Sequence, residues 1–148
     1  MKHLMSGNEA TARGVYEAGI KVCSAYPGTP STEILENLPQ YGEDVYCEWA
    51  PNEKVGTEVA YGASVAGSRA LTTMKMVGLN VAADPLFTAA YMGVGGGYVI
   101  VTADDPSCHS SQNEQDNRHY ARFAKVAMVE PSDPQECKDF VKLACEIS

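Results

Sequence analysis

An acidic residue, Glu53, stands at the head of a segment that is otherwise rich in small and apolar residues (residues 50–67, APNEKVGTEVAYGASVAG). At helical spacing, the face of Glu53 carries only small residues, namely Gly56, Thr57, Ala60, Ser64 and Gly67. Such a face lets another backbone or a flat ring come close. A carboxylate in a first helical turn is also favoured by the helix dipole alone. Glu53 is therefore either an ordinary first-turn acid or a placed catalytic group.

Two further segments place polar or glycine residues just after predicted strands. In residues 26–33 (YPGTPSTE), Thr29 before a proline predicts a helix N-cap, and the free amides that follow it favour an anion. In residues 74–80 (MKMVGLN), Gly78 permits close backbone approach at a helix start. Lys75 is either a solvated charge at a strand end or a ligand. Neither segment has the spacing of a phosphate-binding loop.

A third segment, residues 103–120 (ADDPSCHSSQNEQDNRHY), gathers ionisable and amide side chains in a short space. It lacks the H-x-x-x-H and D-x-D-x-D spacings that make a metal site a strong prediction. No two of the five cysteines are spaced as C-x-x-C, so neither a zinc nor an iron–sulfur site is indicated. The segment is therefore either a polar loop that holds a helix N-terminus or a contact for a small ligand.

Extended and helical segments alternate along the chain, and together they must position these residues. The predicted strands cover residues 20–26, 44–50, 70–76, 96–104 and 125–131. A capping box of Ser6 and Glu9 predicts the first helix, and Pro85 is expected to kink the helix over residues 78–93. We also expect a helix over 113–124. The last helix is amphipathic, with these side chains expected inward: Phe140, Val141, Leu143, Ala144 and Ile147.

This alternation predicts an α/β fold with an open, mainly parallel sheet of about five or six strands and helices on both faces. In such sheets ligands gather at the carboxyl ends of the strands. Glu53 and the three polar segments all follow predicted strands. We therefore expect them to meet at one edge of the sheet.

Size and charge narrow the function classes. The chain has 148 residues, which predicts a single domain, and we expect it to be a fragment of a longer subunit. Its net charge of −8 argues against a nucleic-acid partner, because phosphate binding needs a basic face. No apolar run approaches the roughly 18 residues of a membrane span, and the first residues do not resemble a signal peptide. We expect a cytoplasmic protein that neither binds nucleic acid nor enters a membrane.

Several segments together closely resemble one family, and the resemblance covers essentially the whole chain. The segments are GNEA, AYPGTPSTE, EWAPNEKV, GASVAGSRALTTMK, GLNVAADPL and residues 103–133, of which SSQNEQDNRHYA is the most specific. They resemble the N-terminal, pyrimidine-binding domain of the alpha (large) subunit of indolepyruvate ferredoxin oxidoreductases. More broadly, they resemble thiamine diphosphate (ThDP) enzymes that oxidise 2-oxoacids with ferredoxin.

The resemblance assigns roles to particular residues. That family has a glutamate nine residues before a small-residue turn, and Glu53 and Gly62 have this separation. Glu53 is thus implied to be catalytic, because a carboxyl group hydrogen-bonded to the aminopyrimidine ring promotes removal of the proton from thiazolium C2. The implied cofactor-binding residues are Gly28, Thr29, Pro30, Gly78, Leu79 and Asn80. In the family the threonine that matches Thr29 also lies near the substrate carboxylate.

The sequence departs from the family at two places. Related pyruvate oxidoreductases carry an arginine after the fourth strand for the substrate carboxylate, whereas this chain has no arginine there before Arg118. Arylpyruvate-type members resemble this sequence instead. The resemblance therefore implies that His109, Ser110 or backbone amides bind the substrate carboxylate. Met76 stands where many relatives have histidine, which leaves the role of that position open.

The implied function is oxidative decarboxylation of an arylpyruvate such as indolepyruvate, which gives an acyl-CoA, CO₂ and reduced ferredoxin. Family members bind the diphosphate and Mg²⁺ through a second domain with a GDG…N motif, and hold 4Fe-4S clusters with cysteine repeats. Neither motif occurs here. We therefore expect an oligomer with a beta subunit and the diphosphate-binding domain, and an isolated chain that neither turns over nor binds ThDP tightly. Two other hypotheses remain: a non-oxidative ThDP 2-oxoacid decarboxylase and a non-catalytic interaction module.

Overall fold

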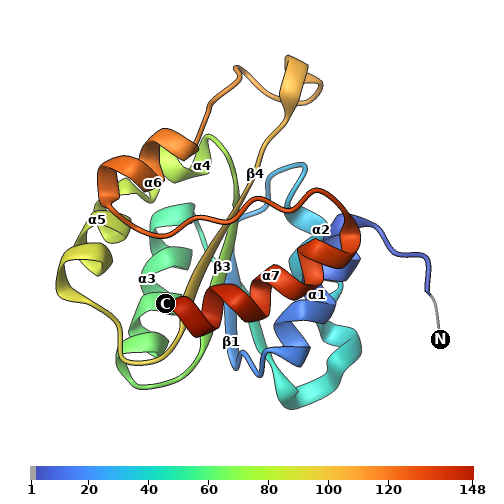
Figure 1. Cartoon of the computed structure of the whole chain (residues 1–148), viewed down its shortest axis with the longest axis vertical. Helices are drawn as coiled ribbons and strands as arrows, with labels where there is room; N and C mark the ends of the chain where they lie inside the picture. The colour runs from blue at the N-terminus through green and yellow to red at the C-terminus, as the bar shows by residue number, and fades with distance from the viewer. Residues whose placement is uncertain (1–2) are drawn as a thin grey trace.

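A single parallel sheet lies at the centre of the molecule, with helices on both of its faces (Figure 1). The computed structural model describes residues 3–148. The strand order is β2-β1-β3-β4, and the strands are β1 Val22–Ala25, β2 Tyr46–Trp49, β3 Ala70–Lys75 and β4 Tyr98–Ala103. The predicted open α/β fold is confirmed, but the sheet has four strands in the described part of the chain rather than five or six.

The register brings the carboxyl ends of the strands to one edge. Ala25 pairs with both Trp49 and Thr73, and Lys75 pairs with Ala103. Because every pair is parallel, the loops that follow the four strands emerge on the same side. The edge predicted to collect the polar segments therefore exists.

The predicted fifth strand, residues 125–131, does not pair with the sheet. No main-chain hydrogen bond joins it to β4 anywhere in residues 3–148. A cavity of about 330 Å³ lies between them, with β4 on one side and Val126, Met128 and Val129 on the other. The apolar, β-branched composition of this segment favours an extended chain, but a strand also needs a neighbour at hydrogen-bonding distance.

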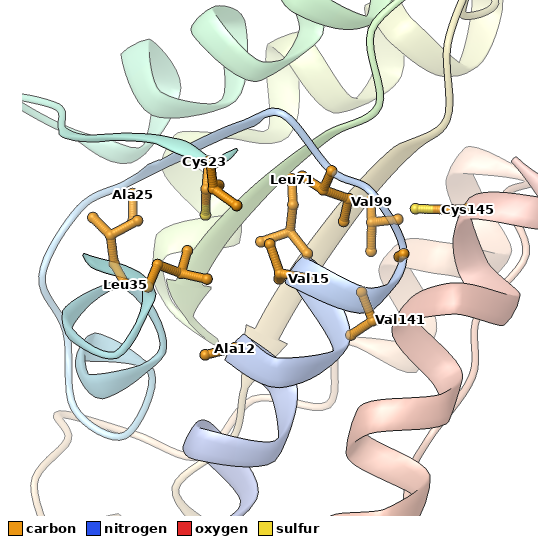
Figure 2. Close-up of a cluster of buried hydrophobic side chains, with 13 residues drawn as sticks. Ala12, Val15, Cys23, Ala25, Leu35, Leu71, Val99, Val141 and Cys145 are labelled. Atoms are coloured by element: carbon orange, nitrogen blue, oxygen red, sulfur yellow. The ribbon is translucent and has the colours of Figure 1, made fainter. Parts of the chain in front are cut away.

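One face of the sheet is covered by three helices, α1 Gly7–Glu17, α2 Thr32–Glu36 and α7 Pro134–Ile147. A 3-10 helix, η1 Leu38–Asp44, follows α2. The predicted capping box of Ser6 and Glu9 starts α1. Figure 2 shows the core beneath these helices, where Val15 of α1 lies beside Leu71 of β3 and Val141 of α7 belongs to the same cluster.

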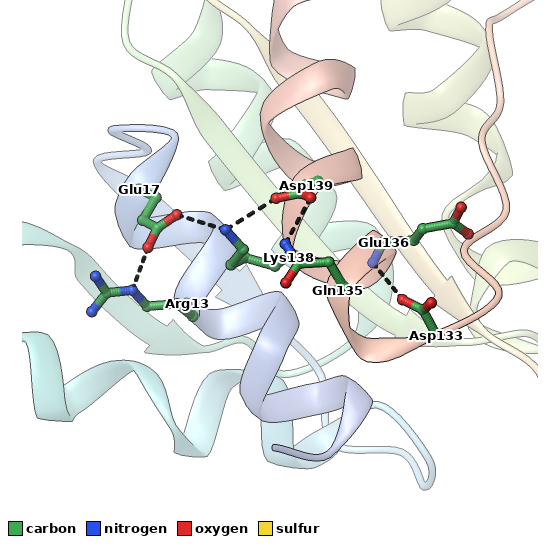
Figure 3. A network of polar contacts seen from close by, with 7 residues as sticks. All are labelled: Arg13, Glu17, Asp133, Gln135, Glu136, Lys138 and Asp139. Atoms are coloured by element: carbon green, nitrogen blue, oxygen red, sulfur yellow. Dashed lines mark hydrogen bonds and ion pairs between the residues drawn. The ribbon is translucent and has the colours of Figure 1, made fainter. Parts of the chain in front are cut away.

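The contact between α1 and α7 has a polar rim (Figure 3). Lys138 Nζ lies 3.2 Å from Glu17 Oε2, and Glu17 Oε1 accepts from Arg13 Nε at 2.7 Å. Exposed pairs of this kind contribute about 0–1 kcal/mol each, so the buried apolar contacts hold the two helices together. Of the predicted inward residues of α7, Val141 is buried, whereas Leu143 and Ile147 are 39% and 52% exposed.

The other face is covered by α3 Glu53–Val65, α4 Gly78–Val81, α5 Ala83–Met92 and α6 Arg118–Ala124. The predicted helix over residues 78–93 is broken at Ala82, so Pro85 lies in the first turn of α5, where its missing N–H is tolerated. The predicted helix over 113–124 begins only at Arg118, after a short 3-10 turn, η2 Pro106–Cys108, and an irregular loop. No described helix is long and apolar enough to cross a membrane.

Replacing Gly14 with alanine is expected to destabilise the fold. A methyl carbon on Gly14 would lie 2.5 Å from the carbonyl oxygen of Lys138, so α1 and α7 would have to move apart. Overpacking of this kind costs about 1–3 kcal/mol. Urea unfolding of Gly14→Ala beside the wild type measures the loss, and an unchanged midpoint would show that the two helices are less closely packed.

Candidate cofactor site at the strand ends

Glu53 is the first residue of α3, at the carboxyl edge of the sheet. β2 ends at Trp49, and the side chain of Asn52 caps the helix by accepting from Val55 N at 3.0 Å. Thr57 adds a second local bond, from its hydroxyl to the Glu53 carbonyl at 2.7 Å. These bonds fix the backbone of Glu53, while its half-buried side chain reaches Gly78.

The side chain of Glu53 lies directly on Gly78, the first residue of α4. A methyl carbon built on Gly78 would be 2.7 Å from both Cγ and Oε1 of Glu53. Only a residue without a side chain leaves room for the carboxylate here. The two residues predicted from separate motifs, 25 positions apart in the sequence, therefore form one small site.

The small-residue face of α3 packs on the sheet of this chain. Gly56, Thr57, Ala60 and Ser64 are buried, and a methyl carbon on Gly56 would lie 3.5 Å from Ser24 Oγ of β1, so the backbone that comes close to this face belongs to the chain's own sheet. Gly67 is not part of this face, because the helix ends at Val65. The small residues thus bring the helix close to the strands.

The turn after β1 holds Gly28, Thr29 and Pro30, but its local structure differs from the prediction. Helix α2 starts at Thr32, so Thr29 is not its N-cap. The turn is instead closed on Gly28, whose carbonyl accepts from Ser31 Oγ at 2.8 Å and whose N–H donates to Thr32 Oγ1 at 2.9 Å. Within residues 3–148, these bonds leave the exposed Thr29 hydroxyl without a partner in the turn.

Lys75 connects the turn after β1 to the loop after β4. A methyl carbon on Gly28 would lie 3.1 Å from Lys75 Cβ, and Lys75 Nζ donates to the carbonyl of Ser110 at 2.5 Å. Lys75 is thus hydrogen-bonded within the chain rather than freely solvated. It anchors the loop that carries His109 and Ser110.

Asp105 shapes the part of that loop that carries the two predicted substrate residues. Its Oδ2 accepts from Ser110 N at 2.7 Å and from Ser111 Oγ at 2.5 Å. The hydrogen bond from Ser111, with that from Ser110, holds the pKa of Asp105 below its ordinary value. The imidazole of His109 remains exposed beside them. Arg118 is paired with Glu130 at 2.7 Å.

A network of amide side chains, missed by the sequence reasoning, joins the loop to the turn after β3. Asn117 is 2% exposed, and its Nδ2 donates to the carbonyl of Met76 at 3.1 Å and to Thr102 Oγ1 at 2.6 Å. Gln115 Nε2 donates to the same carbonyl at 2.9 Å, and Asn80 Nδ2 donates to Gln115 Oε1 at 2.8 Å. The only signal in the sequence is the density of amides in NEQDN. The Met76 side chain itself is buried core.

These residues fit part of a ThDP site. The half-buried carboxylate of Glu53, held against Gly78 at the strand ends, offers the hydrogen-bonding group that an aminopyrimidine needs. Leu79 is buried behind Gly78, and Asn80 lies at the rim, exposed. No cluster of three metal-ligating side chains occurs among residues 3–148.

The fold and the site agree with the class of protein that sequence comparison identifies. Residues 13–148 match the family described as "Pyruvate flavodoxin/ferredoxin oxidoreductase, thiamine diP-bdg". The match covers most of the chain, so the chain belongs to this family of thiamine diphosphate-binding domains. The predicted cofactor and the predicted family are thereby confirmed.

Two curated relatives and one solved structure place the chain more narrowly. It is 59% identical to indolepyruvate oxidoreductase subunit IorA of Archaeoglobus fulgidus over 99% of the chain and 25% of the relative. It is 54% identical to the subunit of that name in Pyrococcus horikoshii over 99% of the chain and 23% of the relative. The chain thus spans about a quarter of the length of these curated relatives.

The solved structure is a 2-oxoglutarate:ferredoxin oxidoreductase from Magnetococcus marinus. It matches with a TM-score of 0.77 and 23% identity, over 95% of this chain and 26% of that chain. At this identity the likeness concerns the fold alone. The same arrangement of sheet and helices thus occurs within that longer chain.

Proposed function

We propose that this domain is the pyrimidine-binding part of a ThDP-dependent oxidoreductase that oxidatively decarboxylates arylpyruvates such as indolepyruvate. The contact of Glu53 with Gly78 at the strand ends carries the proposal. The identity of 59% to an indolepyruvate oxidoreductase subunit supports the substrate class. The reaction converts a 2-oxoacid, CoA and two oxidised ferredoxins into an acyl-CoA, CO₂, a proton and two reduced ferredoxins.

In this proposal the side chains of this chain bind the cofactor ring and orient the substrate. One of them, Glu53, exchanges a proton with the ring. Bound ThDP supplies the carbanion chemistry of 2-oxoacid decarboxylation. The carboxyl group of Glu53 would bind the aminopyrimidine ring and share a proton with it, while Gly78, which has no side chain, leaves the room in which that carboxyl group lies. Thr29, His109 and Ser110 would orient the substrate carboxylate.

The proposal requires partners that this chain does not supply. A diphosphate-binding domain would hold Mg²⁺ and the other half of ThDP, and 4Fe-4S clusters elsewhere in the subunit would accept the electrons. A beta subunit, CoA and ferredoxin complete the proposed system, and the enzyme would be an oligomer. The isolated domain is expected to be inactive and to bind ThDP weakly, because it holds the ring but not the diphosphate.

Substrate specificity and products test this proposal in the assembled enzyme. With CoA and ThDP present, indolepyruvate should reduce ferredoxin or a viologen dye with kcat/KM at least about 10-fold above pyruvate and 2-oxoglutarate, as expected for differential binding of about 1.4 kcal/mol or more. Mass spectrometry should detect the aryl-acyl-CoA in equal amount to CO₂. Release of the arylacetaldehyde without dye reduction would instead identify a non-oxidative decarboxylase.

A further inference from the structure

We propose that Asn117 and Gln115 are positioning residues for the cofactor site. They fix the turn between β3 and α4, and this turn sets the place of Gly78 against Glu53. The inference deepens the proposed function and rests on it, because it concerns how the same site is held in shape. It starts from a buried amide side chain that bonds the ends of two strands at once.

The Met76 carbonyl is the centre of this arrangement. It accepts hydrogen bonds from Asn117 Nδ2 at 3.1 Å and from Gln115 Nε2 at 2.9 Å, while Leu79 N lies at 3.3 Å. The Met76 N–H donates to the carbonyl of Ala103 at 3.0 Å. The backbone two residues before Gly78 is thus tied on one side to β4 and on the other to the loop.

Helix α4 needs such support because it has only four residues, Gly78–Val81. Isolated helices shorter than about 12 residues are marginal in water, so tertiary contacts must hold this one. Buried Leu79 supplies an apolar contact. Asn80 supplies the polar one, because it donates to Gln115 Oε1 at 2.8 Å and accepts from Tyr120 OH at 2.6 Å.

Because Asn117 is buried, each donor and acceptor of its side chain must meet a matching group. Its side chain is almost fully enclosed, at 2% exposure, and it makes three hydrogen bonds: two that it donates, and one that it accepts from Gln115 Nε2 at 2.7 Å. Replacing the amide by a carboxylate keeps the shape but puts an acceptor against the Met76 carbonyl. The turn would then move, because a buried acceptor without a donor is costly. Glu53 itself would keep its own cap.

The test compares variants in the assembled enzyme, with one readout that needs no cofactor. Asn117→Asp, Asn117→Ala and Gln115→Ala are studied by amide hydrogen exchange of residues 77–80 without ThDP. The same variants are then measured for ThDP affinity and for deuterium exchange at C2 of bound ThDP. Asn113→Ala is the control for the loop, because Asn113 is exposed. Val141→Ala, on the other face of the sheet, is the control for lost stability.

We expect faster amide exchange at residues 77–80 and a C2 exchange rate lowered about 10–100-fold in all three variants, as for a misplacement near 1 Å. Asn117→Asp should be at least as impaired as Asn117→Ala. Asn113→Ala and Val141→Ala should leave both readouts unchanged, although Val141→Ala lowers the melting temperature. If an Asn117 variant does not fold, the Gln115→Ala variant tests the inference alone. Gln115 is only half-buried, so its replacement is expected to leave the fold intact.

The inference is overturned if the variants lose only melting temperature, as Val141→Ala does, with unchanged exchange at residues 77–80 and at C2. Failure of the proposed function looks different. In that case the wild-type enzyme shows no ThDP-dependent oxidation of a 2-oxoacid, whereas amide exchange without cofactor still reports whether Asn117 and Gln115 hold the turn.

Discussion

The Glu53→Gln variant of the assembled enzyme is expected to lose about 10²–10⁴-fold in kcat for 2-oxoacid-dependent ferredoxin or dye reduction, the usual contribution of a general acid–base group. Glutamine keeps the size of the side chain and its contact with Gly78, but it cannot share a proton with the aminopyrimidine. Folding should be unaffected, because the amide group fits the same space. Steady-state kinetics with a circular dichroism melt measures both.

Glu58→Gln is the matched control. Glu58 lies on the same helix, is 49% exposed and makes a loose ion pair with Lys54 at 3.9 Å. Its replacement should leave kcat unchanged. Wild-type activity in Glu53→Gln would contradict the catalytic assignment. Glu53 would then be an ordinary first-turn acid that the helix dipole favours. A loss of the same size in both variants would point to a general charge effect on the helix.

Gly78→Ala is expected to have the second-largest effect. Its methyl carbon would lie 2.7 Å from Oε1 of Glu53, closer than any real contact, so the carboxylate or α4 must move. We expect a destabilisation of about 1–3 kcal/mol from overpacking and, because the site is displaced, an activity loss of about 10²-fold. Urea unfolding and kinetics of the assembled enzyme measure the two effects.

A second substitution separates the clash from other causes. Glu53→Asp shortens the side chain, so the double variant with Gly78→Ala should recover stability relative to Gly78→Ala alone, but not activity. A coupling energy of about 0.5 kcal/mol or more is expected for residues in contact. Additive effects would show that the two residues do not touch.

Gly62→Ala is the control for the Gly78→Ala variant, because Gly62 lies in a helix that covers the same face of the sheet as α4. Gly62 lies within α3, is exposed, and a methyl carbon there meets nothing within 4 Å. Alanine should stabilise the helix by about 0.5–1 kcal/mol and leave activity unchanged. The opposite signs expected at Gly62 and Gly78 would show that the cost at Gly78 comes from Glu53 rather than from the loss of a glycine.

Features that depend on neighbours along the chain could be predicted from the sequence alone. The capping box of Ser6 and Glu9, the start of α3 at Glu53 and four of five predicted strands all formed as expected. Each depends on hydrogen bonds or hydrophobic periodicity within a few residues. The family resemblance added the proposed catalytic role of Glu53, which local rules left open.

Other features could not be predicted from the sequence, because they depend on contacts between residues far apart in the chain. Thr29 is not an N-cap, since the turn closes on Gly28 instead. Residues 125–131 stay unpaired because a cavity separates them from β4. The contact of Glu53 with Gly78 and the bonds of Asn117 to Met76 exist only once the strand ends share one edge. No local pattern encodes such contacts, because sheet pairing and burial set these distances.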